Sequence, residues 1–198
     1  MELSAINNFF GDMDLFLLDW VLKGKVVPGS RILDVGCGEG RNAVYFLQNE
    51  FDFTGIDPDE SKIRLIEFLN KQFTTTKARF LVGELATFQS PGLFDFIVCS
   101  RVLHFSKNEE EFLNAIQALA KLLTKEGLLY VAMDSVWDAS IGSVVDANHH
   151  QFPDGKVRFA LTFPRYQHFL KFFTEEEAPR TLIHHGERAQ SFLLLKKT

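Results

Sequence analysis

The chain has 198 residues, of which 46% are hydrophobic and 24% are charged, and its formal net charge is −5. This length suits one domain with a sizeable core, and the composition is typical of an ordered globular protein. The negative charge disfavours DNA and RNA as partners, because binding to a phosphate backbone requires basic patches.

The two cysteines, Cys37 and Cys99, do not form a CxxC pair. Disulfide scaffolding and structural zinc are therefore disfavoured. The chain does not open on a basic segment followed by an apolar one, and the apolar run Leu15–Leu22 is interrupted by Asp19 and too short to span a bilayer. We therefore predict a cytoplasmic protein without a membrane partner.

Residues 1–27 have the pattern of one or two amphipathic helices that end before Pro28-Gly29. From residue 31 to about 134, short apolar runs alternate with segments of helical spacing. Such alternation predicts a parallel sheet covered by helices on both faces. Strands are expected at Arg31–Val35, Phe53–Ile56, Arg79–Val82, Phe94–Ser100 and Leu128–Met133, and helices at Asn42–Gln48, Ser61–Phe73 and Glu110–Leu123.

Residues 135–173 interrupt this alternation and carry the turn Pro153-Asp154-Gly155. Thr174 followed by three glutamates has the pattern of a helix start, but Pro179 disfavours a long helix there. We expect a short turn and then a closing antiparallel hairpin made by Leu182–His185 and Phe192–Lys196.

The most informative segment is Ile32–Asn42, which reads ILDVGCGEGRN. A strand must turn sharply into a helix here, and glycines allow the backbone to approach a ligand closely. The helix N-terminus then presents free N–H groups to that ligand. Asp34 before the glycines and Glu39 between the last two favour a ligand that carries an ammonium and a sulfonium over one that carries a pyrophosphate.

Acidic residues follow the next two predicted strands. Asp57 stands 17 positions after Gly40, close to the spacing at which an acidic residue binds the ribose hydroxyls of a dinucleotide. The segment Gly83-Glu84-Leu85 follows the third strand, where an adenine edge would arrive if the ribose lies at Asp57. Together with the glycine turn, these positions predict a nucleotide-type cofactor site.

With these motifs, the sequence resembles the class I (Rossmann-like) S-adenosylmethionine-dependent methyltransferases from about Arg31 to Asp134. Ile32–Gly40 resembles their glycine-rich motif, and Gly55-Ile56-Asp57 resembles their acidic second motif. Shorter similarities at Gly40-Arg41-Asn42 and Ala132-Met133-Asp134 point to the tellurite-resistance branch. The resemblance implies a doubly wound, mostly parallel α/β sheet of seven strands, with helices on both faces and an antiparallel C-terminal strand.

The resemblance also implies roles for individual residues. Gly36, Gly38 and Gly40 would line the methionine part of S-adenosylmethionine, Asp57 would bind the ribose hydroxyls, and Glu84-Leu85 would face adenine. Ser100 and Arg101 would border the transferring methyl, and S-adenosylhomocysteine would be the product. The full predicted cofactor set is Asp34, Gly36, Cys37, Gly38, Gly40, Asn42, Asp57, Pro58, Gly83, Glu84, Leu85, Ser100 and Arg101, and no metal site is predicted.

The expected organisation is a single methyltransferase domain over residues 1–198. Within it we expect an N-terminal helical lid at 1–30, a cofactor-binding core at 31–134, an acceptor-side segment at 135–178 and a C-terminal hairpin at 179–198. We expect Phe9, Phe10, Trp20, Trp137 and some of the phenylalanines of the acceptor-side segment to close over the methyl group. A tightly packed accessory layer is the alternative use of those phenylalanines.

His104 is the candidate general base, because it follows the fourth strand at the ligand-binding edge of the sheet. The alternative is that it caps the next helix or binds a backbone carbonyl. Arg158 and Arg165 are candidates for holding an acidic acceptor, or else are solvated surface. The pairs His149-His150 and His184-His185 lack a carboxylate or cysteine at metal-ligand spacing.

We therefore predict transfer of a methyl group from S-adenosylmethionine to a small-molecule acceptor. The alternatives are a protein or RNA acceptor, a non-catalytic S-adenosylmethionine-binding sensor or partner subunit, and a nicotinamide dehydrogenase. The last would require GxGxxG, whereas this chain has GxGxG preceded by Asp34. The accepting atom and the oligomeric state are not determined by the sequence.

Overall fold

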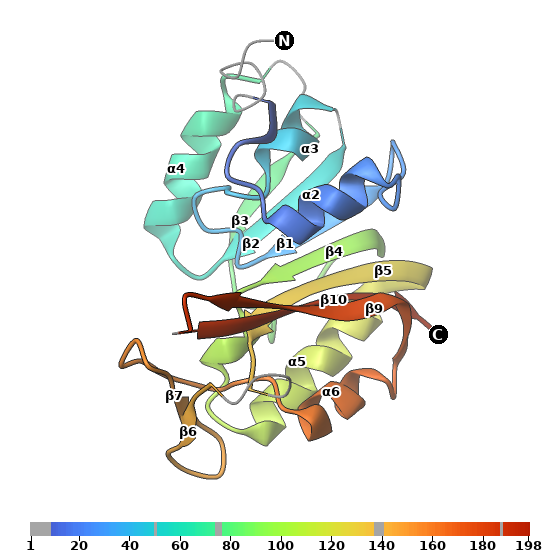
Figure 1. Cartoon of the computed structure of the whole chain (residues 1–198). Coiled ribbons are helices and arrows are strands. Elements are labelled where there is room, and N and C mark those ends of the chain that lie inside the picture. The colour runs from blue at the N-terminus through green and yellow to red at the C-terminus, as the bar shows by residue number, and fades with distance from the viewer. Residues whose placement is uncertain (1–8, 50, 74–76, 137–140, 187) are drawn as a thin grey trace. The chain divides into compact units, whose positions relative to one another are not determined.

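The computed structural model describes residues 9–49, 51–73, 77–136, 141–186 and 188–198. Its strands form a seven-stranded sheet in the order β3-β2-β1-β4-β5-β10-β9 and a three-stranded sheet in the order β6-β7-β8 (Figure 1). β1, β2 and β3 pair in parallel, whereas β10 is antiparallel to both of its neighbours. The predicted mostly parallel α/β sheet with an antiparallel C-terminal strand is confirmed. The chain divides into two compact units, Met1–Val98 and Cys99–Thr198.

In the first unit, short apolar strands alternate with helices, as the sequence pattern predicts. The bounds of β1, β3 and β4 coincide with the predicted ones, and those of α3, β2 and α4 differ from prediction by one to three residues. The elements are α2 (Leu15–Leu22), β1 (Arg31–Val35), α3 (Val44–Gln48), β2 (Asp52–Asp57), α4 (Glu60–Asn70) and β3 (Arg79–Val82), followed by β4 (Phe94–Ser100), which crosses into the second unit.

The core of the first unit is aromatic. The ring of Phe46 on α3 stacks on Phe53 of β2, with 5.9 Å between ring centroids, and meets Phe51 edge-on at 5.4 Å. α4 begins at Asp59, whose side chain accepts a hydrogen bond from the Ser61 backbone N–H, and it buries Ile63 and Ile66. Helix α4 contacts both β2 and β3. This packing fixes the positions of the loops that follow β1 and β2.

In the described part of the second unit, the α-helices α5 and α6 contact each other, and α5 also contacts β5. Figure 1 shows α5 and α6 side by side along the strands β5 and β10. The elements are η1 (Leu103–Phe105), α5 (Glu109–Leu122), β5 (Leu123–Asp134), β6 (Ser143–Val144), β7 (His150–Gln151), β8 (Val157–Arg158), α6 (Phe163–Phe169), β9 (Phe173–His184) and β10 (Arg188–Lys197).

Phenylalanines of the acceptor-side segment pack into the core of this second unit. Phe112 of α5 lies 5.2 Å from Phe159 and 5.7 Å from Phe169, measured between ring centroids. Phe173 is also buried, whereas Phe163 is exposed. For the three buried rings the packed-layer alternative is therefore the one observed.

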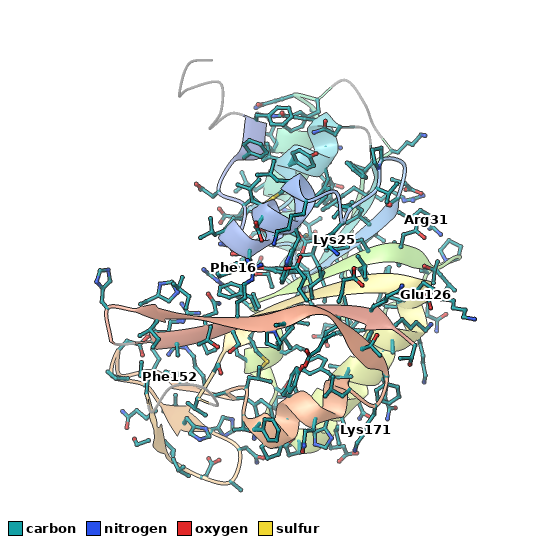
Figure 2. All side chains as sticks on the ribbon, turned by 45° about the vertical axis from the view of Figure 1, so that its right-hand side comes forward. Phe16, Lys25, Arg31, Glu126, Phe152 and Lys171 are labelled. Atoms are coloured by element: carbon teal, nitrogen blue, oxygen red, sulfur yellow. The ribbon has the colours of Figure 1, made fainter. Side chains whose placement is uncertain are left out.

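β5 begins at Leu123, five residues before the predicted start at Leu128. The chain is extended at Leu123 (φ −85°, ψ 145°) immediately after α5. The end of β10 supports this early start: Lys197 donates from Nζ to the Leu123 carbonyl at 2.6 Å, and Lys196 lies 2.5 Å from Glu126, which Figure 2 labels. Contacts from residues 70 and 74 positions away override the local signal of Gly127.

The predicted turn at Thr174 is wrong, because β9 runs without a break from Phe173 to His184. Pro179 lies inside this strand. The register with β10 shifts where Phe192 pairs with Arg180 and Leu194 with Glu177, so Pro179 stands in an irregularity. β9 is also the edge strand of the sheet. Proline is tolerated at bulges and on edge strands because no ladder hydrogen bond is lost there.

Candidate functional site

The glycine turn after β1 depends on backbone conformations that favour glycine. Gly36, Gly38 and Gly40 have φ angles of 66°, 55° and 90°, in the region that side chains with a Cβ rarely adopt. The backbone N–H groups of Gly36 and Cys37 both donate to the Ile56 carbonyl, at 2.8 and 3.0 Å. The turn is therefore anchored to the end of β2.

Asp57 at the end of β2 connects the loops that follow β1, β2 and β3. Its Oδ2 accepts from the Gly38 N–H at 3.0 Å, and its Oδ1 accepts from the Asp59 N–H at 2.9 Å. Its carbonyl accepts from the Gly83 N–H at 3.1 Å. The structure thus brings the predicted residues Gly38, Asp57 and Gly83 together, and the Asp57 carboxylate supports the glycine turn in addition to its predicted ligand role.

Two of these glycines border open space. A Cβ placed on Gly38 or Gly83 meets no atom within 4 Å, whereas a Cβ on Gly40 comes within 2.5 Å of Ile66 Cδ1. Gly40 is therefore required for packing against α4. At Gly38 and Gly83 the backbone itself forms the surface, which is what a closely approaching ligand needs.

Buried carboxyl groups outnumber cations beneath this turn. Asp34 is only 2% exposed, and its carboxyl accepts no hydrogen bond from the described residues. Burial, with the nearby Asp14 carboxylate, raises the pKa of Asp34 to about 8. Asp14 and Asp57 are also buried, and Arg41 is the cation at this cluster, with its Nη2 2.5 Å from Asp14 Oδ1. A bound cation would stabilise the charged form of Asp34.

Asp14 is a site residue that sequence reasoning missed. It precedes α2, and its backbone N–H donates to Asn42 Oδ1 at 2.9 Å, which connects α2 to the segment after the glycine turn. The predicted residue Asn42 is thus buried in a structural contact. The amphipathic pattern of α2 carries no sign of this role, because the partners of Asp14 lie 27 and 28 positions further along the chain.

The remaining predicted cofactor residues of the first unit differ in exposure. Cys37 is buried, and burial with the Asp34 and Asp57 carboxylates raises the pKa of its thiol far above the usual range. It is therefore an unreactive packing residue. Pro58 and Glu84 are exposed and Leu85 is half-buried.

Two predicted residues, Ser100 and Arg101, belong to the second unit. Ser100 is buried at the end of β4, and Arg101 follows it with a φ of 61° and donates its backbone N–H to the Ala132 carbonyl at 2.7 Å. A left-handed conformation at a non-glycine residue stores strain and is found disproportionately at functional positions.

The predicted base His104 lies on the short helix η1. Its Nδ1 is buried without a hydrogen-bond partner within the described residues, so the two structural alternatives, helix capping and carbonyl binding through Nδ1, are not observed. Burial lowers the pKa of His104 to about 4, and the positive charges of Arg188, Arg158 and Arg101 oppose its protonation while Asp134 favours it. The imidazole is therefore neutral at neutral pH.

Asp134, the last residue of β5, organises the charges around His104. It is fully buried and lies 2.7 Å from Arg158 Nε and 2.5 Å from Arg188 Nε. Arg158 also binds Asp154 through both terminal nitrogens, at 3.0 and 2.6 Å. Its guanidinium lies 5.1 Å from the ring centre of Phe152, which Figure 2 labels. Sequence reasoning singled out Arg158 but missed Asp134 and Arg188.

Arg165 is not an acceptor-binding residue and is not solvated, contrary to both sequence-based interpretations. It is 2% exposed, its Nε lies 2.6 Å from Glu109, and its Nη1 donates to the Ala160 carbonyl at 2.7 Å. The guanidinium also packs 3.5 Å above the ring of Phe159. These contacts occupy Arg165 in holding α6 against α5.

The aromatic residues predicted to close over the methyl group are in different surroundings. Phe10 stacks on Tyr45 with 5.8 Å between ring centroids, and Phe9 meets both rings edge-on. Trp20 is completely buried. Trp137 lies outside the described residues. The described part of the chain contains no group of three His, Cys, Asp or Glu residues arranged for a metal ion, and none of its helices is long and apolar enough to cross a membrane.

Comparison with known proteins links this geometry to one family. A family model described as "Methyltransferase domain" matches residues 12–184. A ubiquinone biosynthesis O-methyltransferase of Dechloromonas aromatica is 31% identical over 115 residues, which are 56% of this chain and 48% of that protein. The chain thus spans about half the length of the curated relatives it matches.

Solved structures support the same fold. The 1,6-didemethyltoxoflavin-N1-methyltransferase of Burkholderia thailandensis, solved with 1,6-didemethyltoxoflavin and S-adenosylhomocysteine bound, aligns with a TM-score of 0.73 and 16% identity over 98% of this chain and 83% of that one. TehB of Haemophilus influenzae aligns with a TM-score of 0.67 and 20% identity over 91% and 62% of the two chains. At these identities the likeness shows the fold alone.

Proposed function

Because the chain belongs to the methyltransferase-domain family, we propose that it binds S-adenosylmethionine and transfers its methyl group to a small-molecule acceptor. The observation that carries the proposal is the surplus of buried carboxyl groups, Asp14, Asp34 and Asp57, at a glycine turn that is open at Gly38. Buried charges require partners. A ligand with an ammonium and a sulfonium supplies the missing positive charge, which a pyrophosphate does not.

Each predicted binding residue has a chemical task in this proposal. Asp34 is buried at a cluster whose cation Arg41 pairs with Asp14, and its carboxylate would pair with the cofactor ammonium. The Asp57 carboxylate accepts two backbone N–H bonds, and a carboxylate has about four acceptor positions, so capacity for the ribose hydroxyls is left. We place the adenine near Gly83-Glu84-Leu85 and the transferring methyl near Ser100 and Arg101. The cofactor supplies the activated methyl group.

His104 would take the proton that the acceptor loses. The neutral imidazole has a free lone pair at physiological pH, but a pKa of about 4 makes it a weak base. The nearby arginines Arg101, Arg158 and Arg188 lower the pKa of an acceptor hydroxyl as they lower that of His104. The proposed role of His104 is therefore proton removal from an acceptor that the cluster has already acidified. An alanine at 104 should lower kcat about 100-fold while leaving cofactor affinity unchanged.

The names of similar proteins support a small acceptor. One similar protein is named for ubiquinone biosynthesis, and one similar structure holds 1,6-didemethyltoxoflavin. A protein or RNA acceptor is the competing proposal. A mobility shift of RNA at physiological salt would favour that competitor.

The decisive first test is a thermal-shift comparison of the purified chain with S-adenosylmethionine, S-adenosylhomocysteine, NAD and NADP. A ligand at about 100 times its dissociation constant adds roughly 2.7 kcal/mol of stability. Stabilisation by the two adenosyl compounds alone supports the proposal, whereas stabilisation by NAD contradicts it. Tight adenosyl binding without methyl transfer to a broad panel of small molecules would favour the non-catalytic sensor or partner subunit.

Two further sequence-based predictions concern the whole protein. The single-domain organisation predicts one cooperative unfolding transition, which calorimetry tests. The cytoplasmic location is tested by cell fractionation.

A further inference from the structure

Three side chains share one face where β5 ends and β10 begins. Asp134 is the last residue of β5, and Gln190 is directly opposite it on β10. Directly opposed residues of antiparallel strands project from the same face, as do residues two apart on one strand. Arg188, the first residue of β10, therefore joins Asp134 and Gln190, and its Nε lies 2.5 Å from Asp134 Oδ1.

The two arginines bound to Asp134 differ in how many of their donors are used. Arg158 donates from both terminal nitrogens to Asp154, its Nε forms an ion pair with Asp134 Oδ2 at 2.7 Å, and its side chain is 11% exposed. Arg188 uses only Nε, and its side chain is 24% exposed. Within the described residues, the two terminal nitrogens of Arg188 make no hydrogen bond. Arg158 is thus fully occupied, whereas Arg188 presents a forked pair of donors that Asp134 holds in position.

Two other side chains of the cluster have a buried polar atom without a hydrogen-bond partner among the described residues, as does Asp134 at Oδ2. Gln190 is 2% exposed, and its Nε2 has no acceptor among the described residues. His104 Nδ1 is also buried and has no hydrogen-bond partner among the described residues. A buried polar group without a hydrogen bond costs about 1–3 kcal/mol, so such groups are rare unless a ligand or water satisfies them. The unused donors of Arg188 and Gln190 together require an acceptor-rich group.

The geometry of the unused donors indicates which group that is. Arg158 and Arg188 pair with Asp134 and Asp154, and His104 is neutral, so the guanidinium edge of Arg188 offers the unused donors of this cluster. Parallel N–H donors on a guanidinium match the two oxygens of a carboxylate. Beside His104, the ring of Phe105 is 76% exposed, with its centroid 4.4 Å from that of the imidazole. The apolar or aromatic part of a ligand would have the exposed ring of Phe105 to pack against.

We propose that Arg188 and Gln190 bind a carboxylate of the methyl acceptor, so that the preferred acceptors are small carboxylic acids. This inference rests on the proposed methyl transfer. Ligands of open α/β sheets bind beyond the carboxyl ends of the strands, and Asp134, Ser100 and Arg101 lie at those ends of β5 and β4. Asp134 acts as a positioning residue, because it touches the Arg188 guanidinium and directs its unused edge.

The test compares benzoate with its neutral analogue benzamide on the full chain saturated with S-adenosylhomocysteine. Dissociation constants are measured by NMR titration at constant ionic strength. We expect benzoate to bind at least about tenfold more tightly than benzamide, as a charge-assisted bidentate pair provides. Arg188→Gln should abolish this preference while leaving the affinity for S-adenosylhomocysteine unchanged.

Arg180→Gln is the matched control. Arg180 lies on β9, the partner strand of β10, and its side chain is 34% exposed with an ion pair to Glu177 at 2.8 Å. The change removes the same charge from the same hairpin and should preserve the preference for benzoate. Arg188→Lys is the second test variant, because lysine keeps the charge next to Asp134 but lacks the forked donors. It should retain part of the preference.

Two outcomes would overturn the inference. One is equal affinity of the wild-type chain for benzoate and benzamide. The other is a benzoate preference that survives in both Arg188 variants. Failure of the underlying methyltransferase proposal appears separately, as a wild-type chain that does not bind S-adenosylhomocysteine at all.

Discussion

The first unit gathers three buried carboxyl groups at the glycine turn, whereas in the second unit the buried carboxylate of Asp134 pairs with two arginines. In the first, Asp14, Asp34 and Asp57 lie near Arg41, which pairs with Asp14. In the second, Asp134 pairs with Arg158 and Arg188. The first cluster therefore has a buried carboxyl group that Arg41 does not pair with, and the second has Arg188 donors that make no hydrogen bond within the described residues.

The difference shows how one acidic chain can bind two chemically opposite molecules. The first cluster keeps Asp34 protonated until a cation arrives, and the second keeps His104 neutral and leaves donors on Arg188 unused. In each case we assign a ligand to the groups that lack a partner. A cationic cofactor suits the first cluster and an anionic acceptor suits the second. The following changes test this assignment.

The largest expected effect comes from Asp57→Ala. The change removes the carboxylate that holds the Gly38 N–H and that we assign to the ribose hydroxyls. Because hydrogen bonds to a charged group contribute about 1.5–3 kcal/mol each, affinity for S-adenosylhomocysteine should fall about 100-fold. Isothermal titration calorimetry measures this.

The control is Asp59→Ala, which removes the exposed N-cap of α4. It should cost about 1 kcal/mol of stability and leave cofactor affinity unchanged. Equal affinities of wild type and Asp57→Ala would place the ribose elsewhere.

Asp34→Asn should remove a pH dependence of cofactor binding. The pKa of Asp34 is raised to about 8, so at lower pH a cationic ligand must displace a proton from the carboxyl. Wild-type affinity for S-adenosylhomocysteine should rise by up to about tenfold between pH 6 and pH 7, where the ligand's ammonium stays charged. The asparagine variant should bind more weakly and with a flat pH profile. Parallel profiles for the two proteins would show that Asp34 does not meet the ammonium.

The same residue makes a prediction for the protein without cofactor. Because the folded-state pKa of Asp34 lies above the unfolded value of 3.8, the folded chain binds the extra proton between about pH 4 and pH 8. Its contribution to stability is therefore present at low pH and is lost as the pH rises through 8. Thermal unfolding should show the wild-type Tm falling relative to Asp34→Asn over this interval.

Of the two expected effects of pH on stability, the smaller is the one that His104 has. Its folded-state pKa of about 4 lies below the unfolded value of 6.5, so the unfolded chain binds more protons between these values. The free energy of unfolding should therefore fall as the pH drops from 6.5 to 4. His104→Asn should reduce the loss between pH 7.5 and pH 5 by about 2 kcal/mol, measured by urea unfolding. If the free energy of unfolding falls by the same amount in both proteins, water reaches the imidazole.

Local sequence patterns were enough to predict the alternating strands and helices of the chain. The predicted bounds of Arg31–Val35, Arg79–Val82 and Phe94–Ser100 match β1, β3 and β4 because short apolar runs ended there at glycines or polar residues. The same patterns failed at β9 and at the start of β5, where pairing with the C-terminal strand decides the conformation. Propensity is a weak signal where partners come from distant segments.

The sequence by itself determined the family and the glycine turn, because a glycine turn and the acidic residue after the next strand lie within about 20 positions and repeat a recognisable local geometry. Only the tertiary structure decided which charges are buried together. Asp14 reaches Asn42 across 28 positions, and Arg188 reaches Asp134 across 54. The tertiary structure also distinguishes the two arginines. Arg165 donates hydrogen bonds to Glu109 and Ala160, whereas the terminal nitrogens of Arg188 make no hydrogen bond within the described residues. Burial and pairing depend on which strands become neighbours, and residue spacing along the chain does not contain that information.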